Sequence, residues 1–120
     1  MEIMSYDIEI GVRVYDTNLY VRIAEPEYQH PTYNLGQMFR AATGWNFEQS
    51  KWYRCEEVLP KIRKGIDELR LHPNKYKTLE PKNGWGTLTS AVECLESIRD
   101  CLYEIVGDEE IPIEHLWIRW

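Results

Sequence analysis

Aromatic, amide and arginine side chains are concentrated in and around the loops of this 120-residue chain. Aromatic rings stack on planar groups such as nucleobases, and asparagine amides can hydrogen-bond to base edges or fix a ribose. Guanidinium groups, here those of Arg40, Arg54 and Arg119, can clamp a phosphate through paired hydrogen bonds. The candidate ligand-binding residues that follow from this chemistry are Tyr33, Asn34, Arg40, Trp45, Trp52, Trp85, Trp117 and Arg119.

The same tryptophans have a purely structural explanation. Five of them in a small domain can fill a core and cap its edges. Core packing is the simpler explanation for each tryptophan taken singly, whereas for the group a core and a ligand pocket are about equally favoured. The deciding question is whether Trp45, Trp52 and Trp85 surround a cavity or fill it.

Catalytic signatures are missing from the sequence. It contains no Gly-rich phosphate loop ending in Gly-Lys-Ser/Thr, no Gly-x-Ser-x-Gly nucleophile turn and no His-Glu-x-x-His zinc motif. A metal site would require His30, His72 and His115 to converge in space. We therefore predict a binding protein without catalysis, cofactor or metal, and leave an enzyme with an unconventional carboxylate pair as a weaker alternative.

Charge, hydropathy and cysteine usage limit the kinds of binding partner and the cellular location that this chain can have. A formal net charge of −6 argues against binding to nucleic acid polymers or anionic membranes. No apolar run approaches the roughly 20 residues that span a bilayer, and the acidic, strand-like start lacks the features of a signal peptide. The three cysteines form no Cys-x-x-Cys pair and suit buried thiols in a reducing compartment, so a cytoplasmic location is predicted.

Alternating apolar and polar residues predict a sheet that would position part of this chemistry. Residues 6–15 and 19–24 alternate on either side of the turn-forming residues 16–18, which predicts a β-hairpin. Residues 116–120 alternate again and should lie beside that hairpin. The face of the sheet away from the core would then carry an unusual mixture of side chains: Asp7, Glu9, Arg13, Tyr15, Tyr20, Arg22, Trp117 and Arg119.

Helical periodicity supplies the remaining elements. Asn34 with Gln37 resembles a capping box that opens a helix, and Gly44 is expected to end it in the left-handed conformation. Apolar spacing predicts further helices over residues 56–71 and from Thr87 to a stop at Gly107. The predicted fold is one α+β domain over residues 1–120, with a small antiparallel sheet (the N-terminal hairpin plus a C-terminal strand) and about three helices packed on one face.

Three short motifs, Ser5-Tyr6-Asp7-Ile8, Thr32-Tyr33-Asn34 and the turn at Asn83 before the helix from Thr87, resemble a family of small proteins found in bacteria and their phages. The resemblance spans most of the chain and carries over no catalytic residues. It implies an accessory protein that acts on host machinery, in the host cytoplasm if the chain is phage-encoded.

Two functions are compatible with these features. The first is binding of a small nucleotide-like ligand, with sequestration of an antiviral defence signal as its role. The alternative is an inhibitor or adaptor that contacts a host protein through a tryptophan and arginine surface. Exposed aromatic residues and a terminal edge strand also predict a homo-oligomer, with a dimer favoured.

Overall fold

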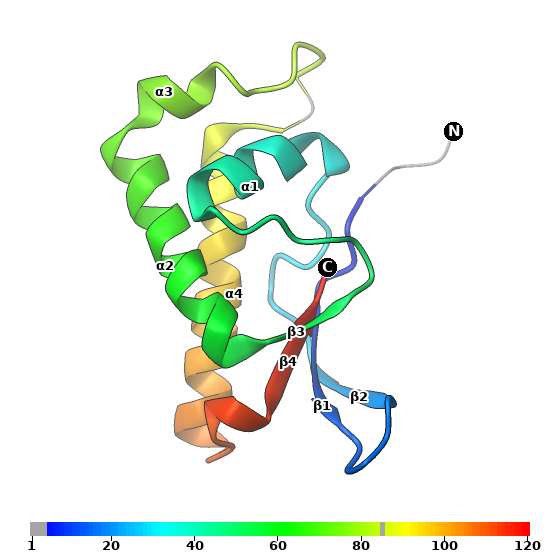
Figure 1. Ribbon diagram of the computed structural model, residues 1–120. Coiled ribbons are helices and arrows are strands. Elements are labelled where there is room, and N and C mark those ends of the chain that lie inside the picture. Colours follow the sequence, from blue (N-terminus) through cyan, green and yellow to red (C-terminus); the bar gives the residue numbers. More distant parts are fainter. Residues whose placement is uncertain (1–4, 85) are drawn as a thin grey trace.

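The computed structural model describes residues 5–84 and 86–120, which form a four-stranded antiparallel sheet with helices against it (Figure 1). The strand order is β2-β1-β4-β3. The strands are β1 (Glu9–Arg13), β2 (Tyr20–Ala24), β3 (Trp52–Arg54) and β4 (Leu116–Arg119). The helices are α1 (Gly36–Thr43), α2 (Cys55–Leu71), α3 (Pro73–Lys77) and α4 (Leu88–Asp108), with single 3₁₀ turns η1 (Tyr33–Leu35) and η2 (Ile113–His115). The predicted α+β fold class is confirmed.

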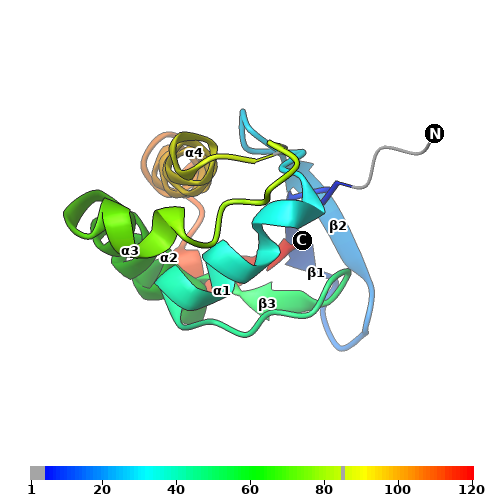
Figure 2. The same cartoon turned by 90° about the horizontal axis from the view of Figure 1, so that it is seen from above.

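The helices gather on one side of the sheet, as Figure 2 shows from above. Ile10 of β1 and Ile118 of β4 are paired and fully buried on that side. They belong to the same hydrophobic cluster as Ile62 of α2 and Ile98 of α4. The apolar residues that alternate along β1 and β4 therefore face the core, which leaves their neighbours on the opposite face.

The sheet differs from the prediction at two points. The C-terminal strand β4 pairs with β1, as expected, but it also pairs with β3 and so lies inside the sheet instead of at its edge. The short strand β3 was not predicted, because three residues are too few to show a period of two. The expectation that a terminal edge strand promotes self-association is therefore wrong for β4, and β2 and β3 are the edges.

Helix ends follow the predicted chemistry only in part. Gly44 ends α1 in the left-handed conformation, with φ of 68°, as predicted. The predicted capping box at Asn34 is wrong, because the Thr32 hydroxyl accepts from the Asn34 N–H and opens η1 instead. Helix α4 is capped by Thr87 but continues through Gly107 to Asp108. Helix α2 ends at Leu71, as predicted, and the His-Pro-Asn segment that follows immediately starts the short α3.

Burial sets the reactivity of the three free thiols. Cys55 and Cys94 are fully buried, and burial raises the pKa of each thiol well above its ordinary range. Cys101 is half-buried on α4, and burial, together with the nearby Glu104 carboxylate, raises its pKa from 9.0 to about 11. All three cysteines are therefore held as neutral thiols near neutral pH.

We expect slow labelling of the native protein by a thiol reagent at pH 8, confined to Cys101 and accelerating as the pH approaches 11. Folding raises the pKa of the Cys101 thiol from 9.0 to about 11, so the folded protein binds the thiol proton more tightly than the unfolded chain does. The contribution of this proton to the free energy of unfolding is therefore present below pH 9 and is lost between pH 9 and 11. Mass spectrometry of native and guanidine-unfolded samples measures the labelling. The C101S variant is the control, and native labelling of Cys55 or Cys94 at the rate of Cys101 would contradict the assignment.

Candidate functional site

Most of the predicted chemistry lies on the face of the sheet opposite the core. The pairings Trp52 with Arg119 and Arg54 with Trp117 place these four side chains on that face. No helix in the described part of the chain covers it. We call this surface the arginine–aromatic face, and its members are Arg13, Tyr20, Arg22, Trp52, Arg54, Trp117 and Arg119.

Gly11 allows the aromatic rings of this face to cross the sheet. A Cβ atom at Gly11 would lie 2.9 Å from Trp52 Cη2 and 2.8 Å from the Val21 carbonyl oxygen, so the Trp52 ring occupies the place of a side chain. The Trp52 ring reaches from β3 over β1 and stacks on Tyr20 of β2, with centroids 4.8 Å apart and planes within 7°. Trp117 meets Tyr20 edge-on at 5.2 Å. The rings thus link all four strands on the side that lacks helices.

Guanidinium groups flank these rings. Arg54 Cζ lies 5.1 Å from the centroid of the Trp117 ring, and Arg119 Cζ lies 5.5 Å from that of Trp52, both within cation–π distance. Arg119 also pairs with Glu9 at 3.2 Å. Arg22 likewise pairs with Glu25 at 2.6 Å and Arg54 with Glu56 at 3.6 Å, so nearby carboxylates balance most of the positive charge of this face.

A pocket of about 470 Å³ opens where this face meets the tip of the β1–β2 hairpin. We call it the Trp117 pocket. Its lining residues are Val12, Arg13, Tyr15, Asp16, Arg54, Glu114, His115 and Trp117. Arg13 Nε donates to the Thr17 carbonyl oxygen at 2.6 Å, and Arg54 lies 3.6 Å from the Glu56 carboxylate. One indole and two guanidinium groups, the elements needed to hold an aromatic anion, therefore meet in one hollow.

The predicted residues from the first half of the chain lie elsewhere. Trp45 is 6% exposed, on the core side of the sheet, where its ring contacts Phe47, Tyr53 and Trp120. Arg40 donates to the Phe47 carbonyl oxygen from Nε and Nη2 and lies 4.3 Å from the Phe47 ring centroid. Trp45 and Arg40 were candidate ligand-binding residues, but both side chains are engaged in local packing and neither lines the Trp117 pocket.

Tyr33 and Asn34 also stay apart from the arginine–aromatic face. Tyr33 packs its ring edge-on against Tyr6 at 4.6 Å, and its hydroxyl accepts a hydrogen bond from Gln49. Asn34 is exposed within η1. Trp85 lies outside the described residues. Of the eight predicted ligand-binding residues, the structure brings together Trp52, Trp117 and Arg119.

Of the residues that line the Trp117 pocket, sequence reasoning placed only Trp117 in the candidate ligand-binding set. Arg54 follows Trp52 by two positions, so both would have been placed on one face had β3 been recognised as a strand. His115 alternates with Trp117 in the sequence and lies in the 3₁₀ turn η2, directly before β4. The structure adds that the tip of the β1–β2 hairpin lies beside His115 and Trp117 in one pocket.

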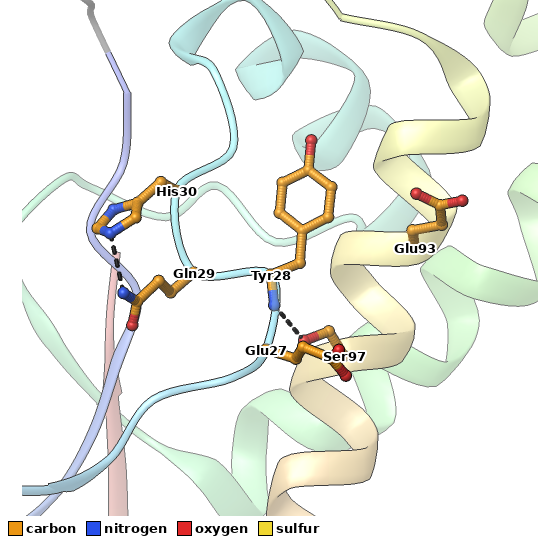
Figure 3. A pocket seen from close by; sticks show the side chains of 6 residues that line it. All are labelled: Glu27, Tyr28, Gln29, His30, Glu93 and Ser97. Atoms are coloured by element: carbon orange, nitrogen blue, oxygen red, sulfur yellow. Dashed lines mark hydrogen bonds between the residues drawn. The ribbon is translucent and has the colours of Figure 1, made fainter.

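A second pocket, of about 540 Å³, lies between the loop after β2 and helix α4 (Figure 3). The Tyr28 N–H donates to Ser97 Oγ at 2.7 Å, and a 2.9 Å hydrogen bond joins the side chains of Gln29 and His30. Glu27 and Glu93 also line this pocket, and its lining includes no arginine or lysine. Its charge therefore suits an anionic ligand less well than that of the Trp117 pocket.

Metal-ligating side chains are dispersed. Among residues 5–84 and 86–120, no three His, Cys, Asp or Glu side chains lie close enough to hold a metal ion. Across the same residues, no helix has the length and hydropathy required to cross a membrane.

No protein-family model, curated protein or solved structure matches this chain.

Proposed function

We propose that this chain binds a small nucleotide-like ligand, a planar ring carrying phosphate, in the Trp117 pocket. The observation that carries the proposal is the meeting of Trp117 with Arg13 and Arg54 in one hollow. The volume of about 470 Å³ falls in the range typical of small-molecule sites. The role is sequestration without catalysis, and the resemblance to small bacterial and phage proteins supports an antiviral defence signal as the ligand.

Arg54 and Trp117 have distinct parts in this proposal. In the structure the Arg54 guanidinium lies over the indole and contacts the Glu56 carboxylate at 3.6 Å. A ligand ring takes its place against the indole, while Arg54 and Arg13 turn to the phosphate. The Asp16 and Glu114 carboxylates also line the pocket and can accept hydrogen bonds from ligand hydroxyl groups.

Calorimetry and thermal-shift measurements with ADP-ribose derivatives and cyclic nucleotides test the proposal. We expect at least one of these probes to stabilise the wild-type chain. Trp117→Ala should weaken its binding about tenfold or more, since one stacked ring contributes roughly 1–3 kcal/mol. Arg54→Ala should weaken binding of phosphorylated probes selectively, because the interaction with the ring is retained.

Two variants on the helical surface provide matched controls. Tyr103 is an exposed aromatic residue with Arg63 Cζ 5.3 Å from its ring centroid, which parallels Trp117 and Arg54. Arg70 is an exposed arginine on α2 that pairs with Glu96. Tyr103→Ala and Arg70→Ala should bind like the wild type. Failure of every probe to stabilise the protein, or equal losses in the control variants, would count against the proposal.

A protein partner is the second candidate function. It is favoured by the Tyr20–Trp52 stack with Arg119 beside it, because prepacked Trp, Tyr and Arg side chains commonly dominate protein interfaces. Such a partner should copurify stoichiometrically with the wild type and with Arg70→Ala, and be lost with Trp52→Ala. Copurification that is insensitive to Trp52→Ala would exclude this face as the interface.

A further inference from the structure

Apolar side chains on the β1–β2 hairpin are left uncovered. In Figure 1 the hairpin lies at the side of the molecule away from the helices. Leu19, Val21 and Ile23 were predicted to share one face of their strand, yet they are 67%, 50% and 41% exposed. Val14, across the hairpin from Leu19, is 39% exposed. Helix-side packing that buries Ile10 and Ile118 therefore stops short of β2, and an apolar strip remains along the edge of the sheet.

The main chain of β2 is also available for pairing at this edge. Val14 N–H donates to the Leu19 carbonyl oxygen at 2.8 Å, which makes 14 and 19 a hydrogen-bonded pair. Alternation along the ladder then makes Val12 and Val21 the next such pair and directs the N–H and C=O groups of Tyr20 and Arg22 outwards. Because β2 is the first strand in the sheet order, these outward groups face no other strand of the sheet.

Charge favours a self-pairing register of β2 centred on Val21 over one centred on Arg22. Antiparallel pairing centred on Val21 would place Val21 opposite itself, Leu19 opposite Ile23, and Tyr20 opposite Arg22 of a second copy. Apolar pairs then lie on one face and a cation–π pair on the other. Moving the centre to Arg22 would instead set two guanidinium groups directly opposite each other, which is unfavourable. The first register also joins the outward-directed main-chain groups of Tyr20 and Arg22 to each other.

We propose that β2 pairs antiparallel with β2 of a second copy of this chain, in the register centred on Val21. The twofold interface extends the sheet across both protomers and joins the two apolar strips side by side. The second copy also contributes its Arg22 to the arginine–aromatic face beside Tyr20. This inference is independent of the proposed ligand, because it rests only on the β2 edge and is tested without ligand.

The size of the interface predicts a reversible dimer. Edge pairing of two five-residue strands buries less than a standard interface of roughly 1,600 Å², so we expect dissociation in the micromolar range. Sedimentation equilibrium over about 1–300 µM should show a shift from monomer to dimer, a range chosen to bracket that affinity. A wild-type chain that remains monomeric throughout this range would overturn the proposal.

Opposite charges at position 21 test the register. Val21→Lys and Val21→Glu should each be monomeric, because the register brings like charges together at the twofold axis. An equimolar mixture of the two variants should dimerise again. Leu71→Lys, which places a lysine at an exposed apolar position at the end of α2, is the matched control and should dimerise like the wild type. Circular dichroism establishes that each variant is folded.

A cysteine pair tests the same register without introducing charge. Val21→Cys should form a disulfide-linked dimer under mild oxidation, since directly opposed residues of a non-hydrogen-bonded pair approach closely. Val14→Cys lies on the same apolar strip of the hairpin but has no self-opposed position, and it should remain unlinked. Equal cross-linking of the two variants, or dimers that persist in both Val21→Lys and Val21→Glu, would overturn the proposed interface.

Discussion

Replacement of Trp120 by alanine is expected to lower the free energy of unfolding by about 3–5 kcal/mol. Trp120 is 2% exposed and follows directly after β4. Its ring stacks on Phe47 at 4.5 Å and meets Phe39 at 5.0 Å, and it also contacts the rings of Tyr6 and Trp45. Truncation leaves a cavity among these rings, and the surrounding helix and strand cannot close it fully.

Urea unfolding followed by circular dichroism measures this loss. Trp120→Phe should cost much less, because it keeps a ring and removes the indole N–H, which is buried without a hydrogen-bond partner among the described residues. Trp117→Ala is the second control, since it removes the same kind of side chain from the half-buried opposite face. Equal losses for Trp120→Ala and Trp117→Ala would contradict the assignment of Trp120 to the core.

Gly65→Ala is expected to destabilise the protein by about 1–3 kcal/mol through overpacking, despite alanine's better helix propensity. Gly65 lies inside α2 at the contact with α1 and α4. A Cβ atom there would lie 2.6 Å from Thr43 Cγ2 and 3.0 Å from Leu95 Cδ1. Thr43 cannot easily turn its methyl group away, because its hydroxyl donates to the Phe39 carbonyl oxygen and accepts from the Trp45 N–H.

A double-mutant cycle isolates the contact between Gly65 and Thr43. Thr43→Ser keeps the hydroxyl and removes the methyl group that a Cβ atom at position 65 would meet. We expect Gly65→Ala to be nearly neutral or stabilising in the Thr43→Ser background, which corresponds to a coupling of about 1 kcal/mol or more. Chemical unfolding of the four proteins measures it. Strictly additive effects would show that the helices separate without involving Thr43.

The candidate site was only partly predictable, because some of its residues lie in strands whose alternation is clear in the sequence and others lie in a strand too short to show it. Trp117 and Arg119 lie in a strand with clear alternation, so their shared face could be predicted. Trp52 joins them through β3, which has three residues and no detectable period. Gly11 resembled a polar-face position in the sequence, and only the fold shows that the Trp52 ring lies over it.

Around the first helix, by contrast, sequence reasoning assigned residues to a ligand site that the structure places in local packing. Trp45 and Arg40 have the chemistry of a ligand site, and nothing in their local spacing distinguishes a stacked ligand from a stacked neighbour. Phe47 supplies that neighbour, because its carbonyl oxygen accepts from Arg40 and its ring packs against both side chains. A contact between residues separated by a loop depends on the path of the loop, which local propensity does not determine.

The sequence by itself determined the elements whose residues alternate or repeat over many positions: the hairpin, the C-terminal strand, the long helices and the left-handed stop at Gly44. These follow from local geometry, since periods of 2 and 3.6 arise within one segment. The tertiary structure decided the strand order, the burial of Trp45, the exposure of Leu19, Val21 and Ile23, and the meeting of Trp117 with Arg54. The physical reason is that burial depends on which surfaces the helices reach, a property of the packed molecule as a whole.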